Sequence, residues 1–215
     1  MAPGEWMEGA KTVVSVFFPF SEEICSRART CPDETCEAWN LGLKAANTFF
    51  LKQIMTGLAD ALTESGVKVL IPSYDPRMKV ENIPVESGGQ PDLHFIPSWS
   101  ERHAGFMAGL GTFGIHRHLI TEKGCAGRFS SMILDLEVEP DERPYTEIYE
   151  YCTRCGACAR RCPVHAISLE KGKNHTRCGL YQKYSGVIYR PRYGCGLCQT
   201  KVPCEHCIPP RRKNT

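Results

Sequence analysis

The sequence lacks the features of exported and membrane-spanning proteins. Its apolar run near the start, from Val13 to Phe20, is interrupted by Ser15 and Pro19, and no basic segment or small-residue cleavage site accompanies it. A transmembrane helix needs about 20 apolar residues, and a secretory signal needs both of the missing parts. We therefore expect a cytoplasmic protein with no leader and no membrane partner.

The chain also lacks an excess of charge of either sign. Lys and Arg total 26 and Asp and Glu total 24 among 215 residues, which gives a formal net charge of +2. Proteins that bind nucleic acids or acidic membranes electrostatically concentrate basic residues. On this ground we expect no nucleic-acid partner, whereas a small-molecule substrate agrees with the composition.

Cysteine is abundant instead. The chain has 13 cysteines, and nine of them lie between Cys152 and Cys207. Thiols of a protein without an export signal stay reduced, so they favour metal ligation over disulfides. The polar segment EPDERPYTEI at residues 139–148 precedes the cysteine-rich part. We predict an α/β body over residues 1–143 and a cysteine-rich domain over residues 144–215.

Apolar patterns in the first part predict a layered α+β body. Apolar residues repeat at helical spacing from Leu43 to Ser65, and Gly66 is placed to end that helix. A Ser-x-x-Glu capping box at Ser98–Glu101 predicts a second helix that runs to about Met107. Buried strands are predicted at KTVVSVFF, VKVLIP, HLIT and FSSMILDLEV. The order of these elements is typical of an α+β fold with an α/β-like layered arrangement.

The segment GLGTFG, from Gly109 to Gly114, fits the dinucleotide motif G-x-G-x-x-G. That motif requires a strand before it and a helix after it, and here the predicted order is the reverse. A helix C-cap followed by tight turns explains the glycines better. A third interpretation is that the glycines let the backbone approach a flat ligand.

Four cysteines form the most informative motif. Cys152, Cys155, Cys158 and Cys162 have the spacing C-x2-C-x2-C-x3-C, and Pro163 follows. In bacterial ferredoxins this run gives three thiolates to one [4Fe–4S] cluster and the fourth to a second cluster. A zinc site needs only two close pairs of ligands. The run therefore predicts two clusters, and five later thiols are available to complete them: Cys178, Cys195, Cys198, Cys204 and Cys207.

These motifs resemble the carboxy-terminal region of epoxyqueuosine reductase, a relative of the reductive dehalogenases. The similarity includes the run just described, TRCGLYQ, GCGLCQ and the segment ERHAGFMAGLGTFGIHRHLIT. It implies a cobalamin held between a nitroreductase-like domain and a ferredoxin-like module with two [4Fe–4S] clusters. It also implies an electron donor such as ferredoxin or flavodoxin. On this resemblance the cofactor-binding residues are Gly109, Gly111, Gly114 and His116.

The resemblance also implies a ligand set for each cluster. Cys162, Cys178, Cys195 and Cys198 bind one cluster, and Cys152, Cys155 and Cys158 bind the other with a late cysteine. At the family's position for that late cysteine this chain has Val202, followed by Pro203. Cys204 is the nearer replacement, and Cys207 is the alternative.

A second departure concerns the proton donor. The family's aspartate, six residues before the match to Glu101, corresponds to Phe95 here. Asp92 and His94 are weak replacements, and their simpler interpretation is that both are exposed loop residues. The family's amino-terminal portion also has no counterpart. We therefore expect a substrate other than epoxyqueuosine in tRNA.

Other thiols and imidazoles remain ambiguous. His116 and His118 are predicted on one side of a strand, as cobalt or substrate contacts or as a solvated face. Cys25, Cys31 and Cys36 fit no cluster spacing, so a thiol-bearing loop or helix start is the favoured interpretation, and Cys125 has no assigned role. The sequence thus predicts an oxidoreductase or reductase subunit carrying two clusters, with a non-catalytic electron carrier as the alternative.

Overall fold

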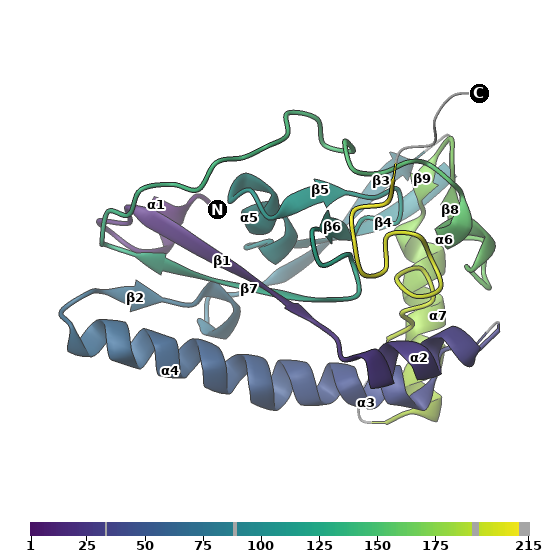
Figure 1. Ribbon diagram of the computed structural model, residues 1–215, viewed down its shortest axis with the longest axis horizontal. Coiled ribbons are helices and arrows are strands. Elements are labelled where there is room, and N and C mark those ends of the chain that lie inside the picture. The colour runs from purple at the N-terminus through teal and green to yellow at the C-terminus, as the bar shows by residue number, and fades with distance from the viewer. Residues whose placement is uncertain (33, 88–89, 191–193, 211–215) are drawn as a thin grey trace.

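This computed structural model describes residues 1–32, 34–87, 90–190 and 194–210. The chain has mixed helices and strands, in which a long helical layer lies along a small antiparallel sheet (Figure 1). The cysteine-rich segments gather at one end of the sheet, beside α7 (His175–Ile188). The predicted mixture of α and β structure is confirmed. Within the described residues, no helix is long and apolar enough to cross a membrane.

The central sheet has the strand order β1-β7-β2, and all neighbours are antiparallel. Strand β1 (Thr12–Pro19) pairs with β7 (Gly127–Leu134) along its whole length, and β2 (Val69–Leu70) covers the other edge of β7. Successive side chains of a strand point to opposite faces. Met132 and Leu134 therefore pack toward the long helix, whereas Ile133 packs toward Trp6 and Trp99. These three predicted strands are confirmed.

The long helix is also confirmed, although it begins earlier than predicted. It consists of α3 (Glu37–Ala45), a π-turn η1 (Ala46–Phe50) and α4 (Leu51–Glu64). The backbone N–H of Trp39 donates to the Cys36 sulfur, so this thiol caps the helix start. Gly66, with φ +85°, follows the end of the helix as predicted.

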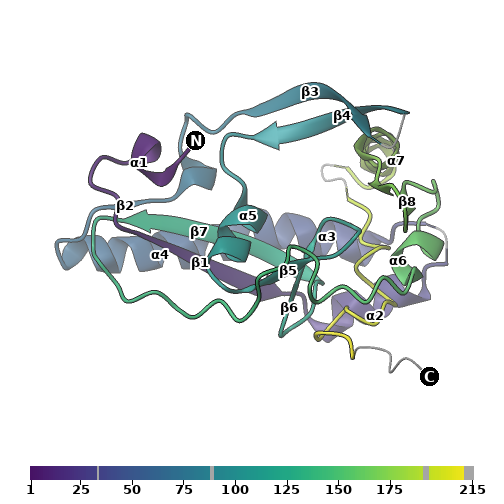
Figure 2. The same cartoon turned by 90° about the horizontal axis from the view of Figure 1, so that it is seen from above.

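A β-hairpin crosses above the sheet, where no strands were predicted. It is formed by β3 (Val80–Ser87) and β4 (Gln90–Pro97), and α7 packs against β4 (Figure 2). The hairpin leads into α5 (Glu101–Met107). The predicted end of α5 is right, but its N-cap is Ser100 rather than Ser98, since the Ser100 hydroxyl accepts from the His103 N–H. The predicted capping box was therefore wrong by two residues.

The remaining elements are short. They are α1 (Pro3–Trp6), α2 (Glu22–Thr30), η2 (Pro72–Tyr74), β5 (Gly111–Phe113), β6 (Leu119–Thr121), α6 (Ala157–Arg160), β8 (Ile167–Ser168) and β9 (Gly172–Lys173). The predicted strands HLIT and FSSMILDLEV both exist, but β6 pairs with β5 and belongs to a different sheet from β7. One buried cluster unites Ile120 and Cys125 with Cys158, Ile167 and Cys204, so the cysteine-rich segments pack directly on the β5–β6 region.

Candidate metal centres and the adjoining cavity

Cysteines that are far apart in sequence meet at two places. At the first, Cys152, Cys155, Cys158 and Cys204 line one small cavity of about 20 Å³, which we call the first cysteine group. Apolar side chains of Ile115, Ile120 and Val202 line the same cavity. The structure thus brings together the three thiols of the run and Cys204. A carboxylate is absent from the described residues that line it.

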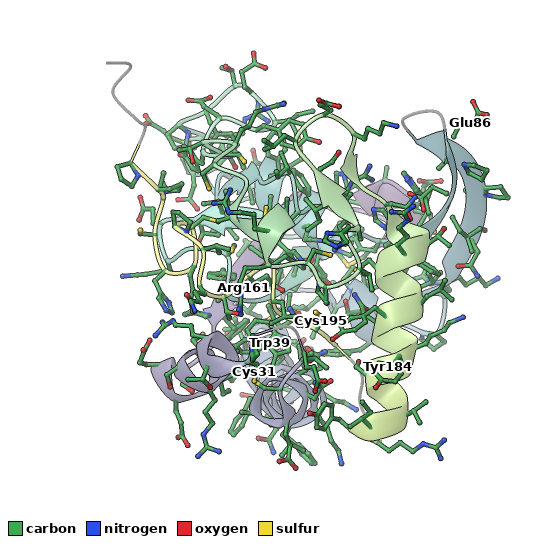
Figure 3. All side chains as sticks on the ribbon, turned by 90° about the vertical axis from the view of Figure 1, so that its right-hand side faces the viewer. Cys31, Trp39, Glu86, Arg161, Tyr184 and Cys195 are labelled. Carbon is green, nitrogen blue, oxygen red and sulfur yellow. The ribbon has the colours of Figure 1, made fainter. Side chains whose placement is uncertain are left out.

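Four other cysteines form the second cysteine group: Cys162, Cys178, Cys195 and Cys198. They line a cavity of about 180 Å³, and Trp39 and Leu43 of α3 line it too. Figure 3 shows Cys195 and Trp39 close together, with Tyr184 on α7 farther out. The sequence predicted two ligand sets, of which the first includes Cys204. Each of these sets lies around a single cavity.

Local backbone features place these thiols. Gly156, with φ +75°, precedes the short helix α6, which presents Cys158. Gly196 also has positive φ, and a Cβ built on it would lie 2.2 Å from the Trp39 ring. A side chain at this position is excluded by both strain and space. The glycine thus lets the Cys195–Cys198 turn approach α3 closely.

Backbone and amide groups donate hydrogen bonds to the second cysteine group. The Ala166 N–H donates to the Cys162 sulfur over 3.2 Å, and the Gln182 side-chain amide donates to the Cys178 sulfur over 3.3 Å. Hydrogen bonds of this kind stabilise thiolates and orient them for metal binding. They support a metal-ligating role for both sulfurs.

Without metal, three of these thiols hold their protons, whereas hydrogen bonds with Cys125 and His116 lower the pKa of Cys204. Burial raises the pKa of Cys158 to about 12, and the neighbouring thiols add to the effect. Burial likewise raises the pKa of Cys195 to about 12 and that of Cys198 to about 11, where Lys173 acts in the opposite direction. Close, dry thiols are costly to ionise unless a cation compensates them. Four cysteine sulfurs around one cavity match the donor set of a [4Fe–4S] cluster.

Cys207 lies outside the first cysteine group. Its side chain is exposed, and its thiol points to the Pro203 carbonyl at 3.7 Å. Val202, at the position where the resemblance predicts the late ligand, lines the first cavity and is 7% exposed. The geometry therefore places Cys204, two residues later, where the late thiol is expected.

A larger cavity of about 630 Å³ adjoins the second cysteine group. His118, Lys173 and Cys178 line both cavities, so the two spaces share a wall. Three strongly basic residues line the large cavity: Arg102, Arg128 and Lys173. The sequence did not single out Lys173 or Arg102, because their role depends on contacts between β9, α5 and the cysteine segments.

The one carboxylate among the described lining residues is Glu101. Burial raises its pKa, although hydroxyl groups of Ser131 and Ser73 donate to it and lower the pKa in part. The three basic side chains nevertheless outnumber this single carboxylate. The large cavity therefore offers a positive environment for a ligand.

The predicted glycine loop lies apart from the large cavity's lining residues. Gly109 follows the end of α5 with φ +84°, as the helix-cap interpretation predicts. An added Cβ on Gly111 would lie 2.1 Å from the Ile120 carbonyl oxygen, and one on Gly114 would lie 2.6 Å from the His116 ring. Packing within the protein thus accounts for all three glycines.

The expectation that His116 and His118 share a strand face was wrong. Both lie in the turn between β5 and β6, where Arg117 has φ +61°. His116 lines the cavity of the first cysteine group, whereas His118 lines the cavity of the second. Their ring centroids are 5.5 Å apart, so this turn lies between the two groups.

Asp92 and His94 lie on β4, so the exposed-loop interpretation was wrong. Asp92 is 5% exposed, and its carboxylate accepts from the backbone N–H groups of His175 and Thr176 at the start of α7. Burial alone would raise its pKa, but these hydrogen bonds outweigh burial and hold the pKa well below its usual value. His94 stacks on His175 at 4.6 Å. Phe95, at the position where the resemblance predicts a proton donor, lines the large cavity.

The early cysteines serve helix packing. Cys25 is buried within α2, Cys31 ends that helix, and Cys36 begins α3, in agreement with the helix-start interpretation. Cys25 also lies near Glu205 and His206, with ligand atoms within 4.8 Å of one another. Cys125, which had no predicted role, lies against Cys204 in the core.

Comparisons with known proteins agree with this geometry. A family model described as a 4Fe–4S binding domain matches residues 145–168. The tetrachloroethene reductive dehalogenase of Desulfitobacterium hafniense is 43% identical over 124 residues, covering 47% of this chain and 20% of that protein. The epoxyqueuosine reductase of Cyclobacterium marinum is 24% identical over 224 residues, covering 98% of this chain and 64% of that protein.

The solved structures show the same fold. An epoxyqueuosine reductase crystallised with an epoxyqueuosine-modified tRNA stem loop has a TM-score of 0.57 and 20% identity, covering 94% of this chain and 51% of that one. The reductase from Streptococcus thermophilus has a TM-score of 0.52. The chain thus spans about half the length of these neighbours. It carries a 4Fe–4S binding domain and is related to the epoxyqueuosine reductases and the reductive dehalogenases.

Proposed function

We propose that this chain is an iron–sulfur reductase, or the redox subunit of one, with two [4Fe–4S] clusters. Cys152, Cys155, Cys158 and Cys204 bind the first cluster, and the second cysteine group binds the other. The support is that each set of four thiols lines one cavity. One observation favours a reductase over an electron-storage or structural protein. The cavity of the second cysteine group shares a wall with the large cavity.

The shared wall sets an order for electron flow. Cys152 and Cys155 of the first cysteine group are partly exposed, whereas the second group lies against the large cavity. Electrons from an external donor such as ferredoxin or flavodoxin therefore pass through the first cluster to the second and then to an acceptor in the cavity. The protein's task is to space these centres and to exclude competing reactions.

The acceptor is a cobalamin-type cofactor or a substrate held directly in the large cavity. A volume of about 630 Å³ lies within the range of cofactor and small-ligand sites, which is about 300–1,000 Å³. Arg102 is held in the wall because its guanidinium donates to the Arg117 carbonyl over 2.6 Å. Lys173, 7% exposed, faces both cavities. A bound cobalamin would supply one-electron chemistry, and these two side chains would bind negatively charged groups of the cavity's ligand.

The substrate differs from epoxyqueuosine in tRNA. Phe95 carries no proton to donate, and Asp92 is occupied by the start of α7 with a lowered pKa, so it stays ionised. Proton delivery at the family's position is therefore missing. An anaerobic assay with reconstituted clusters, cobalamin, a low-potential reductant and epoxyqueuosine-containing tRNA should give no queuosine. Turnover there would contradict this part of the proposal.

Cobalamin binding tests the proposed acceptor. We expect anaerobically reconstituted protein to bind cob(II)alamin in a base-off form with a distinct EPR spectrum. Ser130→Phe should weaken this binding without loss of iron, because Ser130 is buried and lines the large cavity. Ser65→Phe, the same substitution at an exposed serine outside the cavity, is the matched control. Full iron content without cobalamin binding or substrate turnover would favour the alternative, a non-catalytic electron carrier.

A further inference from the structure

Cys204 has surroundings that set it apart among the proposed ligands. It is 8% exposed, and two side chains from the β5–β7 region approach its sulfur. The His116 Nε2 atom lies 3.6 Å from this sulfur, and the Cys125 sulfur lies 3.8 Å from it. All three ligand-type atoms lie within 4.8 Å of one another, and all three residues are buried.

The hydrogen bond at His116 Nδ1 identifies the tautomer of this imidazole. The backbone N–H of His118 donates to His116 Nδ1 over 3.0 Å, so Nδ1 is an acceptor and carries no proton. A neutral imidazole has one N–H donor and one acceptor. The proton therefore resides on Nε2, the atom that faces the Cys204 sulfur.

The ring has little freedom to point elsewhere. His116 is 1% exposed, and its Cε1 atom would lie 2.6 Å from a Cβ built on Gly114. Gly114 thus leaves the space that the ring fills. Rotation of the ring would also break the hydrogen bond that Nδ1 accepts from the His118 N–H, which holds the turn between β5 and β6.

Cys125 is held as firmly as His116. Its N–H donates to the Cys204 carbonyl over 2.9 Å, and its own carbonyl accepts from the Gln199 side-chain amide over 2.6 Å. Its S–H lies 3.8 Å from the Cys204 sulfur, and the Gln199 carbonyl lies at the same distance. The segment that carries Cys204 is therefore joined to Cys125 through both backbone and side chain.

We propose that His116 and Cys125 are positioning residues that donate hydrogen bonds to the Cys204 thiolate and raise the reduction potential of the first cluster. The proposal rests on the proposed function, in which Cys204 is a cluster ligand. Hydrogen bonds to a ligand sulfur stabilise the more negative, reduced cluster more than the oxidised one. In a dry site such a bond acts strongly, because water does not screen it.

Paired substitutions of His116 test the proposal. His116→Leu removes the donor, whereas His116→Gln places an amide N–H near the position of Nε2. We expect the Leu variant to lower the midpoint potential of the first cluster and leave the second unchanged, in an EPR-monitored redox titration. The Gln variant should stay near the native potential. His103→Leu, at an exposed imidazole on α5, is the control and should change neither potential.

Spectroscopy separates a donor from an iron ligand. The reduced native protein should show an exchangeable proton coupled to the first cluster in ENDOR spectra, and His116→Leu should lose it. Cys125→Ala should give a smaller potential shift in the same direction, because an S–H is the weaker donor. An unchanged potential in His116→Leu, or a strong nitrogen coupling typical of directly bound imidazole, would overturn the proposal.

Three further outcomes are decisive. If His116→Leu fails to hold the first cluster, His116→Gln tests the donor role instead. A native midpoint potential in His116→Gln supports that role, and loss of the first cluster from this variant contradicts it. If Cys204→Ala keeps both clusters, the proposed ligand set itself fails. If Cys204→Ala loses the first cluster while His116→Leu and Cys125→Ala change no potential, only this inference fails.

Discussion

The two cysteine groups differ in how they are built and in what they adjoin. Three thiols of the first group come from one short run, and they line a largely apolar cavity of about 20 Å³. The second group draws its thiols from separate segments, including α7, and its cavity of about 180 Å³ shares a wall with the large cavity. Local sequence brings three thiols of the first group together and tertiary packing adds Cys204, whereas tertiary packing assembles most of the second group.

This difference assigns different tasks to two chemically similar sites. The first group contacts apolar core and the hydrogen-bond donors around Cys204, which suits storage and relay of an electron. The second group lies near Lys173 and Arg102, beside the cavity in which we propose that an acceptor binds. The two groups have the same number of thiols, so the difference between them lies in the side chains that surround each group.

The largest expected effect comes from removing the iron. Chelation should unfold the region of residues 152–207, because the thiols that close it would lose the metal that joins them. The β1–β7–β2 sheet, which has its own core, should keep its structure. Hydrogen exchange measured by mass spectrometry should show lost protection in the cysteine segments only. Uniform loss over the chain would show that the two regions do not unfold separately.

Cys204→Ala and Cys207→Ala sharpen the comparison at the first group. The Cys204 variant should lose roughly half of the iron or retain a three-iron cluster, since it removes one of four ligands. The Cys207 variant should keep both clusters, because this thiol is exposed and lies outside both groups. Iron analysis and EPR measure both. The reverse result would make Cys207 the ligand.

Gly196→Ala should affect the second group alone. The added Cβ would clash with Trp39, and φ at this residue is +72°. We expect a loss of about 2–4 kcal/mol in the free energy of unfolding and a weaker second cluster. Gly172→Ala, at φ +71° in open space, carries the backbone strain without the clash and should cost about 1 kcal/mol. Equal effects in thermal unfolding would rule out the contact with α3 as the cause.

The smallest expected effect concerns the anchor of α7, which carries Cys178. Asp92→Asn should lower the free energy of unfolding by about 1–3 kcal/mol, since it removes charge from hydrogen bonds to the helix start. The pKa of Asp92 is lowered from 3.8, so its contribution is present above that pH and is lost as the pH falls below it. Denaturant unfolding at pH 7 and at acidic pH should therefore show the two proteins converging. A constant difference would contradict the role of the charge.

Sequence patterns predicted the parts of this fold that depend on local order. The strand at β1, the helix ended by Gly66 and the cysteine run are of this kind. The hairpin β3–β4 was missed because Pro84, Pro91 and Pro97 interrupt its alternation, and proline normally argues against a strand. The contact between His116 and Cys204 joins residues 88 positions apart, so no local pattern could indicate it.

The iron stoichiometry and oxidation state test the central claim most directly, that each cysteine group binds one [4Fe–4S] cluster. Anaerobically prepared protein enriched in ⁵⁷Fe should contain about eight iron and eight acid-labile sulfide per chain, all with the Mössbauer parameters of [4Fe–4S] clusters. About four iron per chain, or iron in a mononuclear form, would contradict the claim.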